Sequence, residues 1–235
     1  MPATAVINAR LLSSRLPKKL FLPLGGRPIL GNIIDRVRLS KTVDEIIVAS
    51  PDDGEQGEIE DFCKAEGIRW VEGHCCDLPE RLEKVAYVAR NTQIVVLTGD
   101  LPFISHEGID GLVSRFDHSD YDYGNTIDGS GPYLDGTNAE IISAQGIERQ
   151  AREATFGRCH ACIWIRQAEW EKKLTVDAPI SCEKVAHLPV MVDDWATYAA
   201  DQYIYTRLMG DTSYGALLWV MEKYRDDIER IQAKG

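Results

Sequence analysis

A cluster of cations and hydroxyl groups follows the first apolar run of the chain. The run Ala3–Asn8 (ATAVIN) has the character of a buried strand, and the loop Ala9–Gly26 after it carries Arg10, Ser13, Ser14, Arg15, Lys18 and Lys19. A triphosphate is bound by several converging donors, and such a loop offers backbone N–H groups, hydroxyls and cations together. The Walker pattern GxxxxGK[ST] is absent. A solvated basic loop is the alternative, but the position directly after a strand favours a polyphosphate site.

Carboxylates follow two further apolar runs. Asp100 comes just after Gln93–Thr98 (QIVVLT), and Asp193 and Asp194 follow the run that ends at Val192. Carboxylates at strand ends suit a hard cation such as Mg²⁺, which takes one or two protein oxygens together with phosphate oxygens. The alternative for Asp100 is a helix N-cap, but the next helix is expected to begin only near Ser105. One aspartate of the 193–194 pair is expected to cap a helix, and the other could reach the same metal as Asp100.

The elements that would position these groups alternate between strand and helix. Strands are expected at Ala3–Asn8, Glu45–Ser50, Arg69–Glu72 and Gln93–Thr98. Between them, helices are expected from Pro28 onward, around Ile59–Cys63 with a stop at Gly67, and at Pro79–Arg90. This alternation predicts βαβ units, and hence an α/β fold with a mostly parallel sheet flanked by helices. Ligands of such sheets bind beyond the carboxyl ends of the strands, which is where the cations and carboxylates lie.

The second half of the chain has a looser pattern. Strands are expected at Tyr121–Thr126 and Ala139–Ser143, and a further strand at Ala161–Ile165. The expected helices are Gly146–Ala154, Trp195–Met209 and Tyr214–Ile231. No internal repeat or long linker interrupts the sequence, so residues 1–235 are expected to form a single domain.

Composition limits the classes of function. The chain has 235 residues, 44% of them hydrophobic, and a net charge of −11. An acidic chain is poorly suited to bind nucleic acid, although a local group of cations can still hold a small anion. No apolar run approaches the roughly 20 residues of a membrane span, and no secretion signal opens the sequence. We therefore expect a cytoplasmic protein that binds neither nucleic acid nor membrane.

The six cysteines fall partly into two clusters. His74-Cys75-Cys76 and Cys159-His160-Ala161-Cys162 could together form a zinc site. The first cluster is vicinal, however, and regular finger spacing is absent, so reduced and partly buried thiols are favoured over zinc or disulfides.

An ordered series of motifs runs through most of the chain. It comprises Ala9-Arg10, Ser13–Pro17 (SSRLP) with Lys19, Pro23–Leu30 (PLGGRPIL), Val48–Asp53 (VASPDD), Asp77–Arg81 (DLPER), Thr98–Pro102 (TGDLP), Tyr133–Gly136 (YLDG) with Glu140, and Val192-Asp193. In this combination the chain resembles the cytidylyltransferases, which include CMP-Kdo synthetases, acylneuraminate cytidylyltransferases and the SpsF-like spore-coat polysaccharide group.

The resemblance implies a GT-A-like nucleotidyltransferase that joins CTP to a small acidic sugar, such as a 3-deoxy-ulosonic or nonulosonic acid, and releases pyrophosphate. Residues 1–120 would bind the nucleotide, and residues 121–235 would bind the acceptor and form a homodimer. The implied nucleotide-binding residues are Ala9, Arg10, Ser13, Ser14, Lys19, Asp77 and Arg81. Arg10, Lys19 and Asp100 would be catalytic, and Asp100 and Asp193 would hold Mg²⁺. The implied acceptor-binding residues are Asn125, Asp135, Glu140 and His160.

The sequence departs from the family at three places. The family pattern LPGK has Lys18 in place of its glycine, REHVT has become Arg158–Cys162 (RCHAC), and VDTPED retains only its first aspartate securely. Three alternatives remain. They are a nucleotidyltransferase with a phosphonate or sugar-phosphate acceptor, a glycosyltransferase, and a nucleotide-binding relative without turnover. A glycosyltransferase would usually carry a DxD pair, and Asp100-Leu101-Pro102 lacks the second aspartate.

Overall fold

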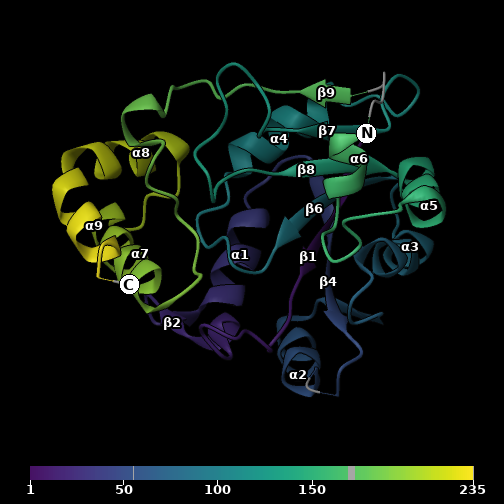
Figure 1. The fold of residues 1–235 in the computed structure, drawn as a ribbon, viewed down its shortest axis with the longest axis horizontal. Coiled ribbons are helices and arrows are strands. Elements are labelled where there is room, and N and C mark those ends of the chain that lie inside the picture. The colour runs from purple at the N-terminus through teal and green to yellow at the C-terminus, as the bar shows by residue number, and fades with distance from the viewer. Residues whose placement is uncertain (55, 169–172, 235) are drawn as a thin grey trace.

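A mixed sheet forms the centre of the protein in the computed structural model, which describes residues 1–54, 56–168 and 173–234 (Figure 1). The strand order is β5-β4-β1-β6-β8-β7-β9. The bounds are β1 Ala3–Asn8, β4 Val43–Pro51, β5 Arg69–Gly73, β6 Gln93–Thr98, β7 Tyr123–Asn125, β8 Glu140–Ser143 and β9 Lys173–Thr175. Strands β5, β4, β1 and β6 are parallel, whereas β8 runs antiparallel to β6 and β7. The expected mostly parallel α/β sheet is confirmed, with β8 as the reversed strand.

Helices cover both faces of this sheet (Figure 1). One face packs against α1 Ile29–Val37, α2 Gly57–Glu66, α4 His106–Arg115, α7 Trp195–Leu208, α8 Tyr214–Lys223 and α9 Arg225–Gln232. The other face packs against α3 Leu78–Val88, α5 Ala144–Glu153 and α6 Ile163–Gln167. Alternation along β1 divides its side chains between the faces, with Ala5 and Ile7 in the larger cluster and Val6 in the smaller. Both faces of β1 and β6 are buried, which explains their continuous apolar sequences, whereas β5 at the sheet edge is largely exposed.

Several local signals give the expected boundaries. Gly67 ends α2 in the left-handed conformation, with φ 66°. Ser105 caps α4, so the alternative role of Asp100 as the cap of this helix is wrong. Asp194 caps α7 through a capping box with Thr197, which leaves Asp193 as the other member of the pair.

The strand expected at Ala161–Ile165 is wrong, because α6 occupies Ile163–Gln167. The Arg166 amide donates to the Cys162 carbonyl at 2.9 Å and closes a helical turn. The Ala161 carbonyl accepts from the side chain of Gln150 on α5 at 2.6 Å, so it is not available to a sheet. A short apolar run has no periodicity that separates strand from helix, and tertiary packing decides here.

The single helix expected at Tyr214–Ile231 is also wrong, because Tyr224 separates α8 from α9 with φ −114° and ψ 24°. The Tyr224 ring packs edge-on against Tyr203 of α7 at 6.1 Å between centroids. The break lets α9 fold back against α7. The apolar stripe that predicted one helix is therefore divided between α8 and α9. Within the described ranges, no helix is long and apolar enough to span a membrane.

A buried carboxyl group lies in α7. Asp201 is 0% exposed, and neither of its carboxyl oxygens has a hydrogen-bond partner among the described residues. Burial therefore raises the pKa of Asp201 well above its ordinary value, and the folded protein keeps this group protonated where the unfolded chain ionises it.

We expect Asp201→Asn to stabilise the protein increasingly as pH rises. The raised pKa contributes stability that is fully present below the unfolded value of about 3.9 and is lost as pH increases toward the folded value. The variant should match the wild type near pH 4 and then gain up to about 1.4 kcal/mol per pH unit. Denaturant unfolding between pH 4 and pH 8 measures this difference, and a pH-independent difference would contradict it.

Candidate active site

Two carboxylates and one ammonium group meet beyond the carboxyl end of β6. The Lys19 ammonium donates to Asp100 Oδ2 at 2.9 Å, to the Val192 carbonyl at 2.6 Å and to Asp193 Oδ1 at 3.4 Å. The Val192 amide donates to the Asp100 carbonyl at 2.9 Å, which joins the two acidic segments. Asp100 and Asp193, 93 positions apart in the chain, therefore direct their side chains at one point.

The backbone at Lys18 aims Lys19 into this site. Lys18 has φ 55° and ψ 25°, the left-handed conformation that favours glycine, and it begins the short 3-10 helix Lys19–Phe21. Lys18 thus adopts a conformation that glycine takes without strain, at the position where the family pattern has glycine. The Lys18 side chain pairs with Glu58.

We expect Lys18→Gly to stabilise the protein by up to about 1 kcal/mol. Relief of the left-handed strain, about 1–2 kcal/mol, outweighs the extra backbone entropy of glycine, about 0.5–1 kcal/mol. Lys18→Met is the matched control, because it also removes the exposed ion pair but keeps a Cβ. If chemical denaturation gave both variants the same stability, backbone strain at this residue would be excluded.

The first of two cavities at this edge has a volume of about 340 Å³. It is lined by Asn8, Ala9, Arg10, Lys19, Leu20, Cys75, Cys76, Leu78, Arg81, Thr98, Gly99, Asp100, Cys159, His160 and Ala161. Four of the residues predicted to bind the nucleotide, Ala9, Arg10, Lys19 and Arg81, are among them. Arg81 is buried, and this burial lowers the pKa of its guanidinium group.

The other predicted nucleotide residues lie outside this lining. Ser13 Oγ accepts from the Leu16 amide at 3.3 Å, and Ser14 is exposed. Asp77 caps α3 through the Glu80 amide at 3.1 Å and pairs with Arg158 Nε at 2.6 Å. Partial burial raises the pKa of Asp77, but these hydrogen bonds outweigh it and lower the pKa overall. The geometry gives Ser13 and Asp77 structural contacts, whereas Ser14 is exposed.

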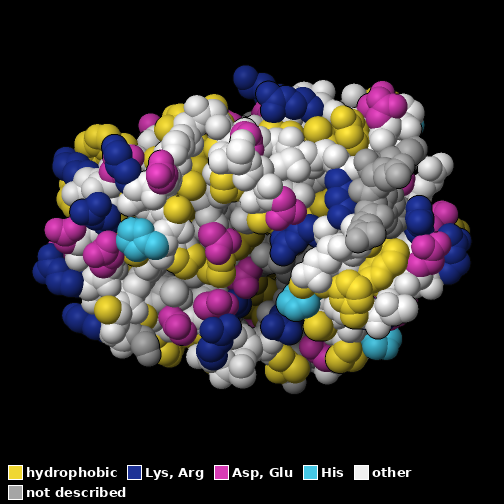
Figure 2. Space-filling model, turned by 45° about the horizontal axis from the view of Figure 1, so that its top comes forward, with side chains coloured by type: hydrophobic (Ala, Val, Ile, Leu, Met, Phe, Trp, Pro, Cys, Tyr) yellow, Lys and Arg dark blue, Asp and Glu magenta, His cyan; other side chains and the backbone are white. Residues whose placement is uncertain are grey.

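The second cavity, of about 600 Å³, adjoins the first. It is lined by Val96, Leu97, Thr98, Asp100, Leu101, Ile127, Pro132, Tyr133, Asp135, Asn138, Glu140, Arg166, Cys182, Ala186, Met191 and Asp193. Thr98 and Asp100 line both cavities, so the cavities meet where Lys19 holds the two aspartates. In Figure 2, acidic and basic side chains lie together along the hollow in the middle of this face.

The residues predicted to bind the acceptor divide between locations. Asp135 and Glu140 line the second cavity, whereas His160 lines the first. Asn125 lines neither, because its buried amide oxygen accepts from the Ile127 and Asp128 amides at 2.8 Å. Glu140 accepts a hydrogen bond from Tyr123, and burial raises the pKa of its carboxyl group.

Arg166 is a site residue that sequence reasoning missed. It is the one cation among the described residues that line the second cavity, and its guanidinium makes no ion pair with them. It lies in α6, one residue beyond the strand expected at Ala161–Ile165, so no local signal marked it. A cation that makes no ion pair with the described carboxylates of this cavity, although its charge acts on Glu140, is suited to an anionic ligand group.

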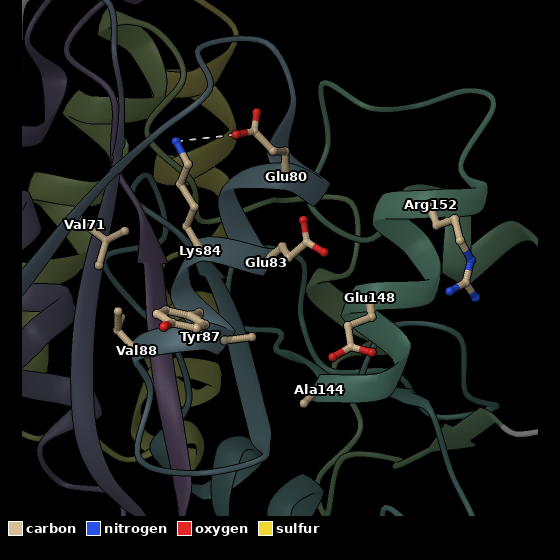
Figure 3. Close-up of a pocket in the computed structure, with 10 residues that line it drawn as sticks. Val71, Glu80, Glu83, Lys84, Tyr87, Val88, Ala144, Glu148 and Arg152 are labelled. Carbon is tan, nitrogen blue, oxygen red and sulfur yellow. Dashed lines mark ion pairs between the residues drawn. The ribbon is translucent and has the colours of Figure 1, made fainter.

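A larger cavity, of about 780 Å³, lies elsewhere, between α3 and α5 (Figure 3). Its charged lining includes Lys84, which pairs with Glu80 at 3.4 Å on the surface of α3. None of the predicted site residues lines it. Convergent polar groups at strand ends mark a ligand site better than cavity size does, so the chemistry favours the two adjoining cavities.

The two cysteine clusters come together only in part. Cys75, Cys76, Cys159 and His160 all line the first cavity, but Cys162 is buried in the smaller core cluster. Over the ranges that the structure covers, no three His, Cys, Asp or Glu side chains gather as a metal site would require. The described residues do not assemble the zinc site considered above.

Comparison with known proteins identifies the family. A match to the cytidylyltransferase family covers residues 4–187. The spore coat polysaccharide biosynthesis protein SpsF of Bacillus subtilis is 35% identical over 124 residues, which are 50% of this chain and 52% of that protein. The chain thus matches about half the length of this curated relative.

Solved structures have the same fold. A cytidylyltransferase from Leptospira borgpetersenii aligns with a TM-score of 0.88 over 97% of both chains, at 23% identity. A CMP:2-keto-3-deoxy-manno-octonic acid synthetase complexed with CTP aligns with a TM-score of 0.65 over 88% of this chain and 99% of that one, at 16% identity. Through its match over residues 4–187, the chain belongs to the cytidylyltransferase family.

Proposed function

We propose that this protein transfers CMP from CTP to the hydroxyl group of a small acidic sugar and releases pyrophosphate. The observation that carries the proposal is the convergence of Asp100, Asp193 and Lys19 at the junction of two cavities. One cavity would hold the nucleotide and the other the acceptor. The acceptor hydroxyl would then attack the α-phosphorus at the junction, with pyrophosphate as the leaving group.

The two aspartates fit a magnesium ion. Their carboxylates are hard oxygen donors, are partly exposed, and already share a positive charge in the Lys19 ammonium. Bound there, Mg²⁺ would neutralise phosphate charge and stabilise the charge that develops during displacement. A Mycobacterium tuberculosis protein of this fold, described as a complex with manganese, supports a divalent ion (TM-score 0.60, 18% identity, 86% of this chain and 99% of that one).

Lys19 and Arg10 would hold the leaving pyrophosphate. Both line the nucleotide cavity, and Lys19 reaches it from within hydrogen-bonding distance of Asp100. An incoming triphosphate would give the Lys19 ammonium phosphate oxygens in place of its carboxylate partners. Asp100 would then be available to the ion, and Asp193 would keep only its pair with the exposed Arg15 at 3.4 Å. Preorganised cations of this kind are worth about 3–4 kcal/mol each in the transition state.

Arg166 supports an acidic acceptor. The acceptor cavity carries Asp135 and Glu140 besides the two metal-binding aspartates, so a carboxylate ligand needs a local cation. Arg166 supplies it, and its planar guanidinium can bind a carboxylate through two parallel hydrogen bonds. Asp135 would accept hydrogen bonds from sugar hydroxyls, and the Asn138 side-chain amide would donate to them.

We expect Arg166→Gln to raise the KM for a carboxylated acceptor by roughly 10- to 100-fold, the value of a lost hydrogen bond to a charged group. The KM for CTP should change little, because Arg166 lines only the acceptor cavity. Arg152→Gln, which removes an exposed arginine of α5, is the control. An unchanged acceptor KM in steady-state kinetics would exclude Arg166 from acceptor binding.

The proposed function is tested by pyrophosphate release. CTP, UTP, ATP and GTP would each be combined with a panel of 3-deoxy-ulosonic and nonulosonic acids, a sugar phosphate and a phosphonate. We expect release with CTP and an ulosonic acid. Release only with the sugar phosphate or the phosphonate would show that the acceptor belongs to the alternative class. CTP binding without any pyrophosphate release would favour a nucleotide-binding relative without turnover.

A cytoplasmic location and a homodimer formed by residues 121–235 remain part of the proposal.

A further inference from the structure

Two adjacent thiols line the nucleotide cavity and have no part in the proposed reaction. Cys75 and Cys76 lie between β5 and α3, and the Cys75 thiol donates to Cys76 Sγ at 3.4 Å. Both are exposed and unoxidised, and both share the cavity lining with Lys19 and Asp100. A ligand on these sulfurs would therefore lie in the space that the nucleotide needs.

Hydrogen bonds hold the backbone of the turn that carries the two thiols. Buried Arg81 donates to the His74 carbonyl at 2.6 Å and to the Cys75 carbonyl at 3.3 Å. The Cys76 amide donates to His74 Nδ1 at 3.1 Å. These bonds hold both cysteine backbones, so the two sulfurs are presented to the cavity as a pair.

The sulfur spacing suits a bridging atom better than a disulfide. Adjacent Cα atoms are about 3.8 Å apart, below the range of about 4.4–6.8 Å usual for disulfides, so an S–S bond here would be strained. A trivalent arsenic atom keeps a lone pair and is pyramidal, so two thiolates bound to it at about 2.3 Å, with an angle of about 95–100° between them, lie about 3.4–3.5 Å apart. The observed 3.4 Å is within a few tenths of an ångström of that spacing. Paired thiolates also select soft centres over hard ones.

We propose that Cys75 and Cys76 form a two-sulfur site for a trivalent arsenical, and that the bound arsenical closes the nucleotide cavity. The reaction needs no oxidant. Two As–S bonds form, the bonds from arsenic to its oxide oxygen break, and that oxygen leaves as water with both thiol protons, while arsenic stays trivalent. The closure of the cavity rests on the proposed nucleotide function, whereas the two-sulfur site does not.

The test uses phenylarsine oxide on the full chain. We expect one equivalent to bind and the three exposed thiols, Cys75, Cys76 and Cys159, to fall to one in a native thiol titration. Cys75→Ser and Cys76→Ser should each weaken binding roughly 100-fold, because a single sulfur loses the chelate effect. Cys159→Ser, which removes the third exposed thiol, is the matched control and should bind as the wild type does.

Saturating CTP is expected to slow the modification by at least about tenfold, and the adduct should no longer bind CTP. Wild-type affinity in either serine variant, or the loss of only one thiol per arsenical, would overturn the two-sulfur site. An adduct that binds CTP normally would overturn the closure of the cavity. If untreated protein bound no CTP, the proposed function would fail, while the arsenical stoichiometry would still decide the two-sulfur site.

Discussion

Asp100→Ala is expected to reduce pyrophosphate release by at least about 10²- to 10³-fold without unfolding the protein. The variant removes one of the two carboxylates proposed to bind Mg²⁺ beside the α-phosphate, and lost electrostatic stabilisation of this kind costs about 3–4 kcal/mol in the transition state. Asp100 is partly exposed, and its backbone bond to the Val192 amide does not depend on the side chain. Initial rates of pyrophosphate release and thermal unfolding would be measured together.

Asp194→Ala is the matched control for this variant. Asp194 neighbours Asp193, the other proposed metal ligand, but its side chain accepts from the Thr197 amide at 2.9 Å and caps α7. Its removal should cost about 1 kcal/mol of stability and leave most of the turnover. Near-normal turnover in Asp100→Ala, or an equal loss in both variants, would argue against a specific metal role for Asp100.

Lys19→Met is expected to lower turnover by about 10²- to 10³-fold while divalent-ion binding is retained. The substitution keeps much of the side-chain volume and removes the ammonium that donates to both aspartates. The leaving pyrophosphate then loses a cation, whereas the carboxylates become free of a competing partner. Manganese binding, followed by electron paramagnetic resonance, separates the two effects.

Lys18→Met provides the comparison for Lys19→Met. Both residues are lysines in the same loop, but the Lys18 side chain is exposed and pairs with Glu58, away from the two aspartates. Lys18→Met should therefore lower turnover far less than Lys19→Met does. If both variants lost turnover equally, loop charge in general, and not the particular position of Lys19, would account for the effect.

The parallel half of the sheet could be predicted because its signals are local. The runs Ala3–Asn8 and Gln93–Thr98 are continuous and apolar since both faces of those strands are buried, and their observed bounds match the expected ones. The two segments whose predicted structure was wrong depend on contacts with residues distant in the sequence. The helix at Ile163–Gln167 follows from packing against α5, and the break at Tyr224 follows from packing against α7.

The same distinction holds for the site. Asp100 could be proposed because it follows a parallel strand, whose carboxyl end is where ligands of such sheets bind. Asp193 was expected to follow a strand as well, but the run before it forms none, and the hydrogen bond from the Val192 amide to the Asp100 carbonyl brings it to the same point. The position of Arg166 and the presence of Cys75 and Cys159 in one cavity could not be predicted, because segments distant in the sequence place these residues there. Asn125 had the polar character of a ligand, but its amide is used within its own turn.

A crystal structure with CTP and Mn²⁺ would test the metal site most directly through the anomalous signal of manganese. An anomalous peak within about 2.2 Å of carboxylate oxygens from both Asp100 and Asp193, beside the α-phosphate, is the result predicted here. A manganese ion bound by the triphosphate alone, with Lys19 still bridging the two aspartates, would contradict it.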